Sequence, residues 1–106
     1  MRTVREGWTA SYADPIRLSA GEAVRLTGRE DIWDGHRWLW AVAPDGREGW
    51  VPDTLVVEGR AARDYSAQEL TCAAGDRLTV IEELHGWVWC DNGKGSAGWV
   101  PLRCLS

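Results

Sequence analysis

Apolar and polar residues alternate along this chain in short runs, and each run is bounded by a glycine turn. Residues 23–27 and 77–80 alternate directly after a Gly-acid pair. The aromatic runs 38–42 and 87–90 are each followed by a Gly-containing turn and then by Gly-Trp-Val-Pro. A period of two predicts β-strands, and a run, a turn and a second run predict a hairpin. No stretch of ten residues keeps a helical period, so we predict an all-β chain.

The same tryptophan pattern occurs twice at a fixed offset. Three tryptophans return 49 positions later (87 − 38 = 49), as Trp38 and Trp87, Trp40 and Trp89, and Trp50 and Trp99. The shared motif is H-x-W-x-W-x9-W-V-P, and a motif repeated at one period marks duplicated structural units. Upstream, the first copy carries five extra residues within a polar, Gly-bounded segment, 28–35, which predicts a longer loop.

The repeat predicts two domains, residues 1–58 and residues 59–106, joined by a linker of five residues over 57–61. Each unit holds about five short strands. Five short antiparallel strands must close into a small barrel to hide their edges. The predicted fold is therefore all-β, with two five-stranded β-barrels in tandem.

Charge and composition narrow the function classes. The chain has 16 acidic and 12 basic residues, a net charge of −4, and neither half has the basic excess that nucleic-acid binding requires. No apolar run approaches a membrane span and the N-terminus lacks an apolar leader, so we expect no membrane partner and a cytoplasmic location. Eight Trp beside no Phe, with Arg far exceeding Lys, are typical of a G+C-rich bacterial genome.

Candidate catalytic and metal-binding groups are few. Cys72, Cys90 and Cys104 lack C-x-x-C spacing, so we expect no metal or cofactor and interpret them as small buried hydrophobes. His36 and His85 recur at the repeat offset, but no nucleophile motif or carboxylate pair accompanies them. We predict that the protein is not an enzyme and that the histidines make hairpin hydrogen bonds.

The second unit resembles an SH3 domain in several motifs. Residues 61–65 resemble the opening A-L-Y-D-Y motif, and residues 69–80 resemble the E-L and G-D-x-L-x-V motifs. Residues 98–101 resemble G-[YFW]-[IV]-P, and Trp87 stands where the family has its groove tryptophan. The first unit shares the later motifs. The resemblance, strongest to the variant SH3 domains of small bacterial proteins, implies two SH3-like barrels that bind a protein or peptide.

The resemblance also implies an aromatic groove in each unit. The implied peptide-binding residues are Tyr65, Trp87, Trp89 and Pro101 in the second unit, and Tyr12, Trp38, Trp40 and Pro52 in the first. SH3 grooves stack ligand prolines held in a polyproline II conformation. Arg63, Cys104 and Leu55 replace tyrosines of the family pattern, and this reduced groove argues against ordinary P-x-x-P binding.

The alternation of side chains along a strand predicts on which face of the sheet the tryptophans lie. If Val88 and Cys90 face the core, Trp87 and Trp89 face the opposite side. The same reasoning sets Leu39 and Ala41 against Trp38 and Trp40.

Outward tryptophans leave two functions open: a protein or peptide site, or a structural or regulatory accessory protein whose Trp faces pair the barrels or form a homodimer. The expected state is a monomer or a weak homodimer. The acidic residues near these strands favour a basic partner; they are Glu30, Asp31, Asp34, Glu82 and Glu83.

Overall fold

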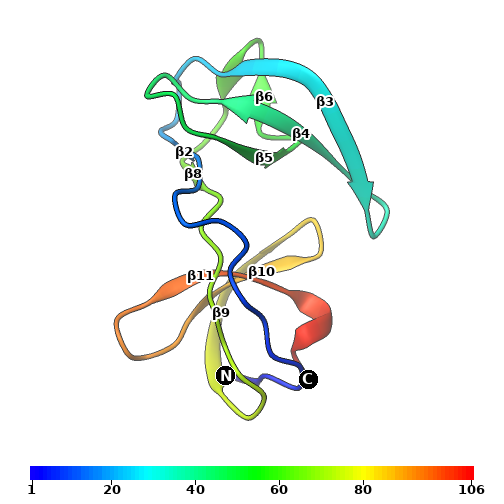
Figure 1. Ribbon diagram of the computed structural model, residues 1–106, viewed down its shortest axis with the longest axis vertical. Helices are drawn as coiled ribbons and strands as arrows, with labels where there is room; N and C mark the ends of the chain where they lie inside the picture. Colours follow the sequence, from blue (N-terminus) through cyan, green and yellow to red (C-terminus); the bar gives the residue numbers. More distant parts are fainter. The chain divides into compact units, whose positions relative to one another are not determined.

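The computed structural model describes residues 1–106 as β-strands joined by turns and by longer irregular segments (Figure 1). Its strands are β1 (Arg2–Thr3), β2 (Arg17–Leu18), β3 (Arg25–Trp33), β4 (His36–Val42), β5 (Glu48–Pro52), β6 (Val56–Val57), β7 (Arg60–Ala61), β8 (Tyr65–Ser66), β9 (Arg77–Leu84), β10 (Trp87–Asp91) and β11 (Ala97–Pro101). A single 3-10 turn, η1 (Leu102–Cys104), is the only helical element. The predicted all-β class is confirmed. None of the elements is a helix that is long and apolar enough to cross a membrane.

The chain divides into two compact units that do not follow the order of the repeats. Unit 1 contains residues 1–13 and 68–106, and unit 2 contains residues 14–67. In Figure 1, the blue N-terminal residues accordingly belong with the yellow-to-red second repeat. Unit 2 is therefore inserted into unit 1, and the chain passes from one unit to the other twice.

The segment predicted as the linker is a hairpin inside unit 2. β6 pairs with β7 through Val56↔Ala61 and Val57↔Arg60. The turn at 58–59 has φ of 52° and 74°, and positive φ at both central positions is what a two-residue type I′ hairpin requires. The predicted linker is therefore wrong. The predicted boundary at residue 58 describes the sequence repeats, whereas the compact units divide elsewhere.

Residues 1–13 and 59–67 play the same part in the two units, and we call them the first and second leading segments. The first leading segment pairs with the second repeat, because β1 lies beside β9 and Val4 bridges to Leu105. The second leading segment pairs with the first repeat, β7 with β6 and β8 with β2. We call the rest of each unit its body, residues 68–106 in unit 1 and 14–58 in unit 2. Each repeat thus contributes its leading segment to the body of the other.

Matching hydrogen bonds show that the two leading segments occupy equivalent places. In each unit, one residue of the leading segment donates its N–H to the backbone carbonyl of an acidic residue. The carbonyl of that same leading-segment residue accepts from the N–H of the glycine that precedes the acidic residue. These bonds, 2.8–2.9 Å long, join Val4 to Asp76 and Gly75 in unit 1, and Ala61 to Glu22 and Gly21 in unit 2. The exchange therefore keeps the backbone pattern of both units intact.

The sheets are antiparallel meanders that bury one face in each unit. β9, β10 and β11 form the meander of unit 1, with β1 at the edge, and β3, β4 and β5 form that of unit 2. The core of unit 1 consists of Val4, Leu70, Cys72, Leu78, Val88, Cys90, Val100, Cys104 and Leu105. In unit 2 the largest fully buried side chains are Ile16, Val51 and Pro52.

The glycine that opens Gly-Trp-Val-Pro is required by close packing. A Cβ on Gly98 would lie 2.7 Å from the backbone of Glu69 and Leu70. A Cβ on Gly49 would lie 2.8 Å from the side chain of Ile16. The motif therefore places glycine where another chain segment crosses β5 and β11.

The five extra residues of the first repeat lengthen a hairpin. Beyond the equivalent pairs Asp31↔Trp38 and Leu84↔Trp87, the first repeat has six residues and the second has two. Four extra residues therefore extend the β3–β4 hairpin by two residue pairs, and the fifth widens the bulge in β3. The predicted loop over 28–35 is wrong, because most of that segment continues β3.

The repeated histidines do not occupy equivalent places. His36 begins β4 opposite Trp33, whereas His85 lies in the β9–β10 turn with φ of 51°. The residue at that turn position in the first repeat is Asp34, also with φ of 51°. The shared offset of the histidines therefore marks no common site.

Candidate aromatic interaction surface

Four tryptophans of unit 2 form a continuous row over β3, β4 and β5, which we call the aromatic row. In order of contact they are Trp38, Trp33, Trp50 and Trp40. Successive ring centroids lie 5.4, 5.1 and 5.1 Å apart, and the last two contacts are edge-to-face. Aromatic contacts of this geometry each contribute about 0.5–1.5 kcal/mol beyond burial. The row is therefore a coupled surface of fixed shape.

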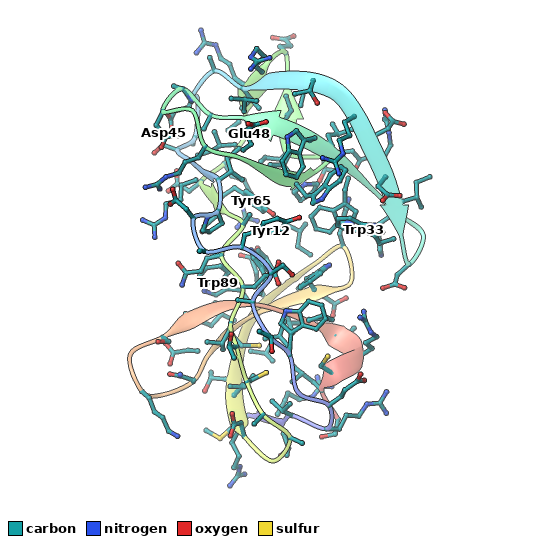
Figure 2. The ribbon with its side chains drawn as sticks, in the orientation of Figure 1. Tyr12, Trp33, Asp45, Glu48, Tyr65 and Trp89 are labelled. Carbon is teal, nitrogen blue, oxygen red and sulfur yellow. The ribbon has the colours of Figure 1, made fainter.

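The strands place these rings by register. Trp40 and Trp50 are direct partners across β4 and β5, and Trp38 lies two residues from Trp40, on the same side of β4. Trp33 ends β3, and it reaches the row because the hairpin is two pairs longer than in the second repeat (Figure 2). The insertion that sequence analysis interpreted as a loop thus completes the row.

Polar groups hold the row in place. The Trp40 indole N–H donates to Glu48 Oε1 at 2.9 Å, and the Trp33 indole N–H donates to Asp31 Oδ2 at 3.1 Å. The Arg29 guanidinium lies 4.7 and 4.9 Å from the ring centroids of Trp40 and Trp50. A cation over an indole face is favourable, so Arg29 stabilises this end of the row.

The predicted acidic loop is part of this structure. Glu30 lies on β3 and accepts a hydrogen bond from Arg37 at 2.7 Å. This hydrogen bond and the positive charge of Arg37 lower the pKa of Glu30. Asp31 is also on β3 and holds Trp33, so only Asp34 lies in the turn.

Unit 1 has two separate tryptophan pairs where unit 2 has a row. Trp8 and Trp87 meet edge-to-face at 5.4 Å, and Trp89 meets Trp99 edge-to-face at 5.3 Å. Trp8 belongs to the first leading segment, and the Arg103 guanidinium lies 5.7 Å from its ring centroid. No tryptophan corresponds to Trp33, because the β9–β10 hairpin is shorter.

The carboxylate of Glu69 fixes the first leading segment to unit 1. Its Oε1 accepts from the Trp8 indole N–H at 2.9 Å, the Ser11 N–H at 3.1 Å and the Ser11 hydroxyl at 3.0 Å. Trp8 also exchanges both backbone hydrogen bonds with Cys72, at 2.8 and 2.9 Å. Neither Glu69 nor Trp8 was predicted as a site residue, because their contact joins positions 61 residues apart in the sequence.

Burial separates the eight predicted site residues into three groups. Trp40, Trp87 and Trp89 are half-buried. Tyr12 is 49% exposed (Figure 2). The remaining residues are buried, namely Trp38, Pro52, Tyr65 and Pro101. The two prolines retain less than 2% of their surface, so in this structure they support the sheet from within.

The predicted alternation is confirmed in β10 and only partly in β4. Val88 and Cys90 are 1% and 0% exposed, while Trp87 and Trp89 keep surface on the other face. In β4, Ala41 is buried as predicted, but Leu39 is half-buried. Trp38, expected outside, is buried, and Trp33 stacks on it, a contact that depends on the hairpin extension.

Tyr12 is not the counterpart of Tyr65. Tyr65 lies opposite Leu18, and the matching bridge in unit 1 joins Trp8 to Cys72. Trp8 also follows Val4 at the spacing at which Tyr65 follows Ala61. The residue of unit 1 that corresponds to Tyr65 is thus a tryptophan, Trp8, and not a tyrosine.

The cysteines are core residues, as predicted. Cys72, Cys90 and Cys104 are all buried in unit 1. Burial raises the pKa of Cys90 to about 11 and also raises the pKa of the other two thiols. Because the thiolate is the reactive form, these thiols are poor nucleophiles at neutral pH.

Both repeats match the family model of the variant SH3 domain, over residues 1–59 and 59–106. The chain therefore belongs to the variant SH3 domain family and carries two tandem copies. No curated protein and no solved structure matches the chain. SH3-type domains are in general non-catalytic protein-interaction modules.

Proposed function

We propose that this chain is a non-enzymatic protein- or peptide-interaction module whose main ligand surface is the aromatic row of unit 2. The observation that carries the proposal is the contact of four tryptophans in one row, three of which, Trp33, Trp40 and Trp50, keep accessible surface. Tryptophan is the residue most enriched at binding hot spots, because its rigid ring buries a large area at little entropic cost.

The ligand is a basic peptide or protein segment. Unit 2 carries ten acidic and seven basic residues within 14–67, a net charge of −3 (7 − 10). Glu48 lies beside the row and is exposed (Figure 2). The burial of Pro52 and Tyr65 supports a ligand that uses the row in place of the ordinary proline groove. Each unit, in this proposal, is an SH3-like five-stranded barrel in a cytoplasmic bacterial protein.

Titration of the full chain with a set of basic peptides, followed by NMR, tests the proposal. We expect shift changes at the indoles of Trp40 and Trp50, and Trp40→Ala should weaken binding by about 2–4 kcal/mol. Trp89→Ala is the matched control, because Trp89 holds the same repeat position in unit 1, with Trp99 as its edge-to-face partner. Binding lost equally in both variants would contradict the choice of unit 2.

The alternative function makes a different prediction. If the Trp faces serve barrel pairing or a homodimer, every peptide should leave the spectrum unchanged. For the homodimer, the mass measured by light scattering should also rise with protein concentration in the wild type and not in Trp40→Ala.

A further inference from the structure

We propose that the first leading segment is exchangeable between molecules, and that a second copy of this chain is the partner that supplies it. In the exchanged dimer, residues 1–13 of each copy complete unit 1 of the other. This inference is independent of the ligand proposed for unit 2.

The two leading segments are connected to their units in different ways. The second leading segment follows its body directly, through the two-residue turn at 58–59. The first leading segment is joined to residues 68–106 only through the whole of unit 2. Release of residues 1–13 therefore opens unit 1 alone, whereas release of residues 59–67 requires a tight hairpin to open. Exchange through a connecting segment is the low-cost route to a dimer of this kind.

The contacts of the first leading segment are the same whichever copy supplies it. They include the backbone bonds of Val4, the paired bonds between Trp8 and Cys72, and the three bonds accepted by Glu69. The equilibrium between monomer and dimer is then set by protein concentration against the effective concentration of the tethered segment. Opening and reclosing unit 1 at high protein concentration should therefore trap dimers.

Exchange also changes the surface of unit 1. Trp8 supplies one ring of the Trp8–Trp87 pair, and Arg103 of the body lies over Trp8. In the dimer this pair is composite, because Trp8 comes from one copy and Trp87 from the other. The second copy thus contributes a residue to the aromatic surface.

A directed disulfide between two full-length variants tests the exchange. Thr3 and Arg77 are exposed Cα partners across β1 and β9. Thr3→Cys and Arg77→Cys chains are mixed, unfolded in urea with reductant, refolded together at about 1 mM and oxidised. We expect a dimer of twice the monomer mass, in which peptide mass spectrometry finds the Thr3–Arg77 cross-link.

The matched control pairs Thr3→Cys with Arg25→Cys, an exposed β3 position of unit 2. Exchange predicts at least tenfold less cross-link in the control. The proposal is overturned if the cross-link between positions 3 and 77 forms in no greater yield than the control cross-link and the refolded protein has only the monomer mass.

A rate measurement gives a second readout. Glu69→Ala removes the acceptor of three hydrogen bonds on the first leading segment, and we expect it to speed dimer formation in native buffer by about tenfold or more. Glu83→Ala, an exposed carboxylate on β9, should leave the rate unchanged. Equal rates for the two variants would count against exchange of this segment.

Discussion

Unit 1 and unit 2 are built from the same two parts in opposite chain order. Unit 2 has its body first and its leading segment last, joined by the turn at 58–59, and it is continuous over 14–67. Unit 1 has its leading segment first, and its body follows only after unit 2. The backbone hydrogen bonds of the two leading segments nevertheless follow the same pattern in both units. Duplication has therefore produced two leading segments that make equivalent backbone contacts, each with the body of the other repeat.

The aromatic faces differ for a local reason. In unit 1, Trp89 lies directly opposite Glu82, whereas in unit 2 a wider bulge lies opposite Trp40 and carries Arg29 over its ring. The longer hairpin adds Trp33, which links the rings of Trp38 and Trp50. Five extra residues thus turn separate pairs into a row.

Cutting the chain gives the largest expected effect. Residues 14–67 alone should keep the urea midpoint that unit 2 has in the full chain. Residues 59–106 alone should lose at least about 3 kcal/mol relative to unit 1, because they lack Val4 of the core and Trp8, which packs against the core. Circular dichroism in urea measures both. An unchanged midpoint for residues 59–106 would mean that the second leading segment can serve its own body.

Equivalent glycine substitutions should destabilise the units unequally. Gly98→Ala sets a Cβ against backbone at 2.7 Å, so we expect a cost of about 2–4 kcal/mol in unit 1. Gly49→Ala sets a Cβ against the side chain of Ile16 at 2.8 Å and not against backbone, so about 1–2 kcal/mol is expected in unit 2. Amide hydrogen exchange reports each unit separately. A larger loss at Gly49 would contradict the packing described here.

High pH should weaken unit 1 selectively, because all three cysteines lie there. Burial raises the pKa of Cys90 from 9.0 to about 11, so the unfolded chain loses its proton first as pH rises. The stabilisation that comes from keeping the Cys90 thiol protonated is fully present below pH 9 and is lost by about pH 11. Over that range the free energy of unfolding falls by about 1.4 kcal/mol per pH unit. Hydrogen exchange at pH 9.0 and at about pH 11 measures the loss of stability in unit 1. Cys90→Ala should make the stability of unit 1 less dependent on pH. An unchanged dependence on pH would assign the effect to other groups.

The smallest effect concerns the cation on the aromatic row. Arg29→Ala should lower the stability of unit 2 by about 0.5–1 kcal/mol, because the guanidinium covers two indole rings. Arg25→Ala, an exposed position on the same strand, serves as the control. Chemical denaturation followed by Trp fluorescence compares them. Identical midpoints for the two variants would show that Arg29 does not stabilise the row.

The sequence predicted the individual strands better than it predicted which segments pair with one another. The alternation of Val88 and Cys90 and the Gly-Trp-Val-Pro strands followed from local pattern, because a strand's inward face depends on its own residues. The exchange of leading segments left no local signal, since both segments have similar pairing capacity. The turn at 58–59 resembled a linker because Glu-Gly satisfies either role.

The candidate site was predicted in part. Trp40, Trp87 and Trp89 were identified from the repeat and keep surface in the structure. Trp33 and Arg29 were not assigned, because their positions depend on hairpin length and on a bulge that a sequence repeat does not specify. Trp8 was missed because its contacts with Glu69 and Trp87 span most of the chain.

The insertion of unit 2 sets an order of events at the ribosome. Unit 2 is complete once residue 67 has been made, but Val4 bridges to Leu105, 101 positions along the chain (105 − 4 = 101). The 38 residues still to be added (105 − 67 = 38) take roughly 2–8 s at about 5–20 residues per second. During that interval the body that the first leading segment completes in its own chain has not yet been made.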